Sequence, residues 1–230
     1  MNSPLNLFEE QIHIHFKDQK LLENVFIHRS FLNENKELHL HSNEKLEFLG
    51  DSVLSLITSM YLYKLYPLLQ EGDYTDIKAA IVRTESLAEV GKDLHLGEFL
   101  FLSKGEENSN GRENINLLAD CFEALVAAIF IDHGFDKAYE FVLTYLFSTR
   151  LDFIVKNKLY LSPKSRLQEI VQAKHKILPL YRTIDEQGPE HHKVFNVSVY
   201  IHDKLVGNGT GTSKKQAEEH AAKNALENMQ

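Results

Sequence analysis

Apolar residues recur at helical spacing over the first two thirds of the chain. The pattern is interrupted by turn signals at Tyr66-Pro67 and Glu71-Gly72-Asp73 and by a polar stretch over 103–114, which is predicted to be a mobile loop. None of these segments alternates convincingly in the manner of a strand. One or two helices are predicted over 5–27, and further helices over 43–65, 77–82, 87–96, 117–131 and 135–156.

The period changes in the last 70 residues. Ser162 is a good N-cap and Pro163 suits the first helical position, so a helix is predicted to begin there. Residues 180–186 alternate like a strand, and residues 195–201 place apolar side chains at every second position. A third strand starts after a turn at Asp203-Lys204 and leads into a final helix. The predicted order is α-β-β-β-α.

These patterns divide the 230 residues into two domains. The fold class is an all-α domain over 1–156 followed by a small α+β domain over 162–230, joined by a short linker.

Two acidic pairs lie within the most apolar helices. Glu47 and Asp51 are four residues apart, and Asp120 and Glu123 are three apart, so each pair shares one helical face. From Leu117 to Ile131, 13 of 15 residues are apolar, which predicts a helix that is buried on all sides. Buried carboxylates are costly unless they are paired or bound to metal, and hard divalent ions prefer oxygen ligands. The two pairs together therefore predict a metal site.

A solvated acidic face is the ordinary alternative for either pair alone. It is less favoured here because two apolar helices carry the same arrangement. The paired histidines at 13 and 15, 39 and 41, and 191 and 192 are also able to bind metal, but solvated loops explain them better.

The acidic segments carry a family resemblance. Residues 43–54, NEKLEFLGDSVL, resemble the signature of ribonuclease III, the endonuclease of double-stranded RNA, and residues 118–130, LADCFEALVAAIF, resemble its second acidic motif. Lys45 stands where the family often has Arg, and Ile115-Asn116 stand where many members have Glu-Ser. Neither departure adds or removes a carboxylate of the four.

The resemblance implies a homodimer that cleaves double-stranded RNA, with one acidic cluster in each subunit. It implies that Glu47, Asp120 and Glu123 hold Mg²⁺, with Mn²⁺ as a substitute, and that Asp51 and Glu123 are catalytic. The implied products carry 5′-phosphate and 3′-hydroxyl ends. The implied substrates are precursors of ribosomal RNA and other structured RNAs, including messenger and transfer RNA.

The C-terminal region resembles the double-stranded-RNA-binding domain from Ser162 to Met229. Ser213 and Gln216 form a capping-box pattern, which puts Lys214 and Lys215 at the positive end of a helix dipole. Cations are unfavourable there unless a phosphate binds, so this placement favours RNA contact. The other predicted contacts, for each of which a solvated side chain is the alternative, are Gln168, Glu169 and His191.

The net charge of −8 is unusual for a nucleic-acid-binding protein, but the charge is divided unevenly. Residues 157–230 hold 11 Lys and Arg against 8 Asp and Glu, whereas residues 1–156 hold 14 against 25. This asymmetry indicates an acidic half that loads metal and a basic half that holds RNA. The single cysteine, Cys121, suits a reducing compartment, and neither a signal peptide nor a membrane span is visible. The cytoplasm is expected.

Two other functions fit parts of the pattern. A non-catalytic RNA-binding protein on the same fold is expected to lack one or more of the four carboxylates, all of which are present. A metal-dependent hydrolase of small phosphorylated molecules has no need of the C-terminal module.

Overall fold

The computed structural model describes residues 4–187 and 193–229. The chain divides into two compact units, Met1–Asn157 and Lys158–Gln230, which are described separately. The elements of the first unit are α1 (Pro4–Ile12), α2 (Gln19–Val25), α3 (Arg29–Glu34), η1 (Lys36–Leu38), α4 (Glu44–Leu65), α5 (Glu71–Ile81), α6 (Thr84–Asp93), α7 (Leu96–Phe99), α8 (Lys104–Asn108), η2 (Gly111–Glu113), α9 (Ile115–His133), α10 (Phe135–Val142), η3 (Leu143–Leu151) and α11 (Asp152–Lys156). Those of the second unit are α12 (Pro163–His175), β1 (Leu180–Gln187), β2 (Val194–Ile201), β3 (Lys204–Gly211) and α13 (Lys214–Asn228).

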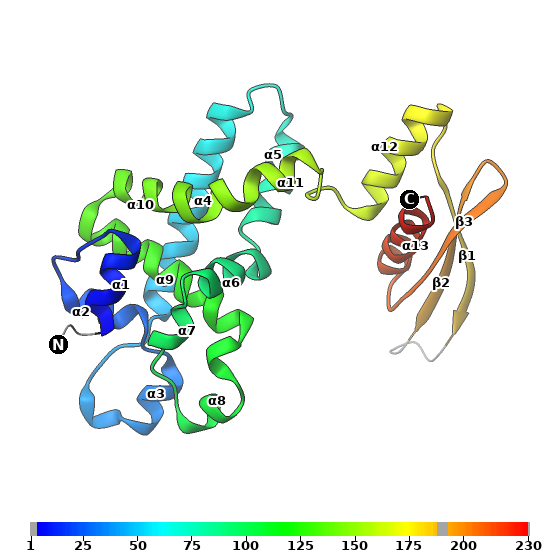
Figure 1. Cartoon of the computed structure of the whole chain (residues 1–230). Coiled ribbons are helices and arrows are strands. Elements are labelled where there is room, and N and C mark those ends of the chain that lie inside the picture. Colours follow the sequence, from blue (N-terminus) through cyan, green and yellow to red (C-terminus); the bar gives the residue numbers. More distant parts are fainter. Residues whose placement is uncertain (1–3, 188–192, 230) are drawn as a thin grey trace. The chain divides into compact units, whose positions relative to one another are not determined.

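The described part of the first unit is helical, as predicted, and α9 is its central helix. Figure 1 shows α9 surrounded by other helices, and α4, α6 and α10 pack directly against it. The apolar run predicted to be buried is buried from Leu118 to Ile129 apart from Asp120 and Glu123. Ile131, which ends that run, is 52% exposed.

The bounds of α4 agree with the sequence prediction. Asn43 occupies the N-cap position and is buried, and its side-chain amide donates to Val25 O at 3.1 Å. The helix ends at Leu65, where Tyr66 and Pro67 follow. The main chain of this helix is thereby fixed to the core at the end that carries the first acidic pair.

Three predictions for the first unit need correction. Residues Glu71-Gly72-Asp73, predicted to form a turn, are the first turn of α5, which Gln70 precedes as the N-cap. The polar stretch 103–114 is not a simple loop, because it folds into α8 and the short 3₁₀ helix η2. Ser103 caps α8 by accepting the Glu106 N–H at 3.2 Å, a local signal within the polar composition. The helix over 135–156 is present but changes to π-helical geometry over Leu143–Leu151.

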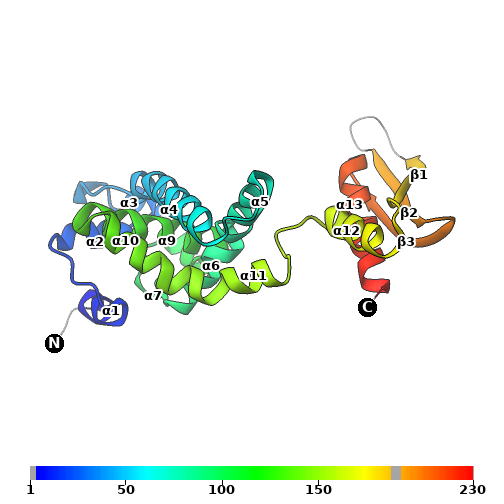
Figure 2. The same ribbon diagram turned by 90° about the horizontal axis from the view of Figure 1, so that it is seen from above.

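The second unit has the predicted α-β-β-β-α order. Its three strands form an antiparallel sheet in the order β1-β2-β3, and α12 and α13 lie on one side of it (Figure 2). The turn between β2 and β3 is at His202-Asp203, one residue earlier than predicted. The core contains Leu167, Val171, Val197, Val199, Ile201, Ala217, Ala221, Ala222 and Ala225.

Glycines let α13 rest directly on β3. A Cβ added at Gly209 would lie 2.1 Å from Ala221 N and 2.4 Å from Ala217 O, so no larger residue fits between strand and helix. This contact places the first turn of α13, with its lysines, at the end of the sheet where β3 stops.

Among the helices of residues 4–187 and 193–229, none combines the length and the apolar character that crossing a membrane requires.

Candidate active site

The first unit carries its acidic cluster where α4 crosses α9. A Cβ added at Gly50 would lie 1.9 Å from Glu123 O, so the two backbones touch at this point. Glu47 and Asp51 lie on either side of Gly50 along α4, and Asp120 precedes Glu123 by about one turn on α9. Close crossing at a glycine therefore brings together the two pairs, whose nearest members in sequence, Asp51 and Asp120, are 69 residues apart.

The electrostatics of Glu123 show that all four carboxylates interact. Burial, together with the negative charges of Asp51, Asp120 and Glu47, raises the pKa of Glu123 to about 8, and burial makes the largest contribution. Burial also raises the pKa of Glu47. The negative charges of Asp120, Glu44 and Asp51 raise it too, and the positive charge of Arg29 lowers it. The pKa of Asp120 is raised by burial, with a smaller opposing effect from His28.

The cluster lies nearer to the surface than the sequence predicted. Glu47, Asp120 and Glu123 are half-buried and Asp51 is exposed, so the expectation of buried carboxylates is wrong for Asp51. The reason is that α4 packs on α9 with one face only, and its neighbouring face, which includes Phe48 and Ser52, is open to solvent. An exposed rim gives a large substrate access to the carboxylates.

The donor set is suited to a hard divalent cation. It consists of carboxylate oxygens that repel one another, and a cation among them would relieve both the repulsion and the cost of burial. In residues 4–187 and 193–229, no three His, Cys, Asp or Glu side chains are already arranged as a metal-binding group. The structure thus brings the four predicted side chains together, while their roles as ligands remain a prediction.

A polar network that the sequence reading left without a role lies beside the cluster. His28 Nδ1 is 2.8 Å from Ser30 Oγ, which accepts the Ser103 N–H at 3.0 Å. Burial lowers the pKa of His28, while the negative charges of Glu106 and Asp120 act in the opposite direction. This network connects the first turn of α3 to the segment before α8.

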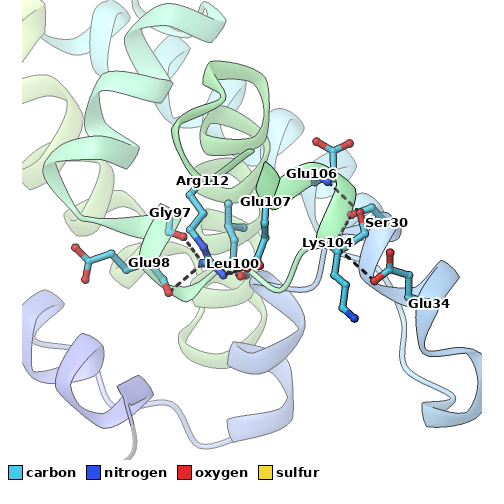
Figure 3. Close-up of polar contacts among 10 residues, drawn as sticks. Ser30, Glu34, Gly97, Glu98, Leu100, Lys104, Glu106, Glu107 and Arg112 are labelled. Carbon is cyan, nitrogen blue, oxygen red and sulfur yellow. Dashed lines mark hydrogen bonds and ion pairs between the residues drawn. The ribbon is translucent and has the colours of Figure 1, made fainter. Parts of the chain in front are cut away.

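Arg112 fixes the chain just before α9. Its guanidinium donates to three backbone carbonyl oxygens, those of Gly97 at 2.8 Å, Leu100 at 3.0 Å and Glu98 at 3.3 Å, and it pairs with Glu107. Figure 3 shows these groups converging on the one side chain.

The polar residues of α3 and α8 meet in the same region. The Lys104 N–H donates to Glu34 Oε2 at 3.3 Å, and both residues lie beside Ser30 and Glu106 in Figure 3. Together with Arg112, these contacts give order to a stretch that its composition assigned to a loop. The helix that presents Asp120 therefore starts from a fixed point.

The predicted RNA-contact residues of the second unit are exposed wherever the structure describes them. Gln168 and Glu169 project from α12, and Lys214 and Lys215 form the first turn of α13. Glu169 is paired with Lys158. His191 lies outside the described residues.

The N-terminal cap of α13 is partly as predicted. Ser213 Oγ accepts the Gln216 N–H at 3.2 Å, which is the expected half of a capping box. The Gln216 side chain accepts from Thr212 N at 2.8 Å and from Thr212 Oγ1 at 2.9 Å. In the second half of the box, the Gln216 side chain therefore accepts from the backbone N–H of Thr212, one residue before the N-cap Ser213 that the pattern indicated.

Comparisons with known proteins agree on both units. A family model described as ribonuclease-III-like matches residues 18–150, and one described as a double-stranded RNA binding motif matches residues 163–229. The chain is 42% identical over 222 residues to Ribonuclease 3 of Pelotomaculum thermopropionicum, covering 96% of this chain and 92% of the relative. It is 43% identical over 226 residues to Ribonuclease 3 of Dehalococcoides mccartyi, covering 98% and 95%.

A solved structure resembles the first unit. The nuclease domain of ribonuclease III from Campylobacter jejuni, described as having structural flexibility in a region involved in dimer formation, matches with a TM-score of 0.58 at 35% identity. The match covers 62% of this chain and 96% of that one.

Proposed function

The chain belongs to the ribonuclease III family of endoribonucleases, and we propose that it hydrolyses double-stranded RNA with Mg²⁺, leaving 5′-phosphate and 3′-hydroxyl ends. The observation that carries this proposal is the convergence of Glu47, Asp51, Asp120 and Glu123 at the Gly50 crossing. Four interacting carboxylates at an exposed rim suit phosphodiester hydrolysis better than any structural role, because they raise the cost of folding.

Roles follow from position and burial. Glu47, Asp120 and Glu123 are the half-buried members, and we assign them to holding Mg²⁺, with Mn²⁺ as a substitute because carboxylates suit both ions. Asp51, the exposed member, and Glu123 are assigned to catalysis at the scissile phosphate. When bound, the metal supplies an activated water and stabilises the leaving 3′ oxygen.

An exposed apolar stripe on α4 supports a homodimer. Phe48, Leu56, Met60 and Tyr63 are 79%, 53%, 47% and 77% exposed, and they recur at intervals of three, four and eight residues on one side of the helix. Large apolar side chains exposed together on one side of a helix indicate a protein–protein contact, whereas single exposed ones are ordinary. We propose that a second copy of the chain covers it, so that two clusters act on the two strands of one duplex.

The second unit is proposed to hold the duplex by its shape and phosphates. Lys214 and Lys215 would contact phosphates, and Gln168, Glu169 and His191 would contact minor-groove groups. We propose 1–156 and 162–230 as the limits of the two domains. The expected substrates are ribosomal RNA precursors and other structured RNAs in the cytoplasm.

Incubation of the protein with long duplex RNA and Mg²⁺, beside an EDTA control, tests this function. Cleavage with Mg²⁺ alone and end groups of 5′-phosphate and 3′-hydroxyl are expected. Binding without cleavage in Mg²⁺ would favour the non-catalytic RNA-binding alternative. Hydrolysis of small phosphate esters in preference to duplex RNA would favour the small-molecule hydrolase.

A further inference from the structure

One carboxylate in the second unit is shared by two lysines. Glu186, near the end of β1, has Oε1 at 3.0 Å from Lys214 Nζ and Oε2 at 3.0 Å from Lys193 Nζ. Both ammonium groups also lie over the Phe195 ring, with Nζ 5.7 Å from the centroid for Lys214 and 5.9 Å for Lys193. The four side chains form one cluster, referred to below as the Glu186 cluster.

The strand register explains why these residues meet. Glu186 pairs with Phe195 between β1 and β2, and Phe195 pairs with Gly211 between β2 and β3. The chain then turns after Gly211 and reaches Lys214 within three residues, while Lys193 lies directly before β2. The cluster is therefore built by the sheet itself at the end where α13 begins.

The cluster contributes little as a structural tie. The side chains of Glu186, Lys193 and Lys214 are 33%, 42% and 58% exposed, and ion pairs at such exposure give little net stability. In addition, Lys214 lies at the positive end of the α13 dipole, and this unfavourable position for a cation offsets part of what its ion pair with Glu186 contributes.

The chemistry of the shared carboxylate matches that of an RNA phosphate. A carboxylate and a phosphodiester are both monoanions that offer two oxygens to cations, and lysines bind either as point charges. Glu186 gives one oxygen to each lysine, as a bridging phosphate would. One of the two lysines is already a predicted phosphate contact of the proposed function.

We propose that Glu186 is an internal competitor for RNA phosphate. In the free protein it occupies the space between Lys193 and Lys214, and a backbone phosphate of the duplex displaces it. Glu186 thereby sets the affinity for duplex RNA and its salt dependence, and Lys193 joins Lys214 as a phosphate contact. This proposal rests on the proposed binding of double-stranded RNA by the second unit.

The test measures duplex binding by the full-length Glu186→Gln variant. Binding is followed by fluorescence anisotropy in EDTA, which prevents cleavage, on a duplex longer than about 16 base pairs, the span of one such domain. The variant should bind several-fold more tightly than wild type. The plot of log affinity against log salt should be steeper by about one, because one more phosphate contact is made at full strength.

The matched control is Asp203→Asn, which removes the same charge at the exposed β2–β3 turn, the opposite end of the sheet. It should change affinity much less than Glu186→Gln. When Glu186→Gln is added to a variant that already carries Lys193→Ala and Lys214→Ala, it should not increase the affinity of that double variant, because no lysine pair remains for it to release. Thermal melts establish that each variant is folded.

The outcomes separate this proposal from the function on which it rests. Equal gains in Glu186→Gln and Asp203→Asn would reduce the effect to net charge and overturn the competition. Weaker binding by folded Glu186→Gln would overturn it as well, since the carboxylate would then be supporting the lysines. Failure of the wild-type protein to bind any duplex would contradict the proposed RNA binding itself, and the competition with it.

Discussion

In both units a helix contacts a neighbouring backbone at a glycine, but the contact positions negatively charged side chains in the first unit and positively charged ones in the second. At Gly50 the crossing of α4 and α9 gathers carboxylates, which repel one another and resist ionisation. At Gly209 the contact of α13 with β3 presents lysines that stay exposed, one of them neutralised by Glu186. A bound cation would therefore stabilise the acidic cluster of the first unit, whereas the lysines of the second unit suit an anion without any cofactor.

This contrast predicts that catalysis and binding separate on mutation. Glu123→Gln keeps the shape of the side chain but removes one charge from the acidic cluster. Cleavage of duplex RNA in Mg²⁺ should fall by orders of magnitude, because metal affinity and water activation both decline. Duplex binding should remain close to that of wild type, since the second unit is unchanged.

Glu10→Gln is the matched control for Glu123→Gln, because Glu10 is exposed on α1. This control should cleave at the wild-type rate. Near wild-type cleavage by Glu123→Gln would contradict the assignment of the cluster, and early melting with loss of binding would make Glu123 a residue of the structural core.

The glycine contacts themselves can be broken. Gly50→Ala forces a Cβ against Glu123 O and should destabilise the first unit by about 3 kcal/mol or more, with loss of cleavage. Gly209→Ala should instead destabilise the second unit and weaken duplex binding. Thermal unfolding, cleavage and binding assays on both variants measure these effects.

Gly72→Ala is the control for both glycine variants, because a Cβ at Gly72 meets no atom within 4 Å. It should be neutral or slightly stabilising within α5. If Gly50→Ala behaved like Gly72→Ala, the close crossing would not be what positions the carboxylates.

Local patterns were sufficient to predict much of this contrast. Helical spacing identified α4 and α9 and the two acidic pairs, and strand alternation identified β1 and β2 with their order. Composition failed at 103–114, because the Ser103 cap and the Arg112 contacts to distant carbonyls stabilise structure that polar residues alone do not indicate.

Contacts between distant segments account for the rest. The depth of the acidic cluster depends on where α4 crosses α9, and periodicity does not give a crossing point. A glycine between Glu47 and Asp51 was the available signal for it. The sharing of Glu186 by two lysines depends on strand register, which aligns Glu186 with Phe195 and Phe195 with Gly211. The start of α13 then brings Lys214, 28 residues from Glu186 in sequence, within reach of its carboxylate.

A smaller effect is expected from the lysines of α13. Changing Lys214 and Lys215 together to Ala should weaken duplex binding roughly tenfold. The slope of log affinity against log salt concentration should become shallower by about two. The unit should melt at the same temperature or slightly higher, because the unfavourable interaction with the helix dipole is removed. Anisotropy across a salt series and thermal melts without RNA provide the measurements.

The double change of Lys174 and Lys204 to Ala removes the same charge from other exposed positions and should affect binding less. A clear drop in melting temperature for the α13 variant would show that its lysines support the fold instead.

The smallest expected effect is a pH dependence of stability that arises from the acidic cluster. The pKa of Glu123 is about 8 in the folded protein and about 4.3 in an unfolded chain, so between these values the folded state holds a proton that the unfolded state has released. The contribution of Glu123 to stability is therefore greatest below this window and is lost as the pH rises through it. The raised pKa values of Glu47 and Asp120 act in the same direction.

Thermal melts in EDTA between pH 5.5 and 8.5 check this expectation. The free energy of unfolding of wild type should fall by about 1–3 kcal/mol across the window, a figure reduced because Glu123 is partly exposed, and that of Glu123→Gln should fall less. The lowered pKa values of Asp132 and Glu186 act at lower pH. The lowered pKa of His28 makes stability rise with pH near the acidic end of the range, in wild type and variant alike, so the difference between the two curves reports Glu123. At pH 8, Mg²⁺ should restore wild type more than Glu123→Gln, because a cation favours the ionised cluster. Parallel curves for the two proteins would mean that the four carboxylates do not interact as closely as the crossing at Gly50 requires.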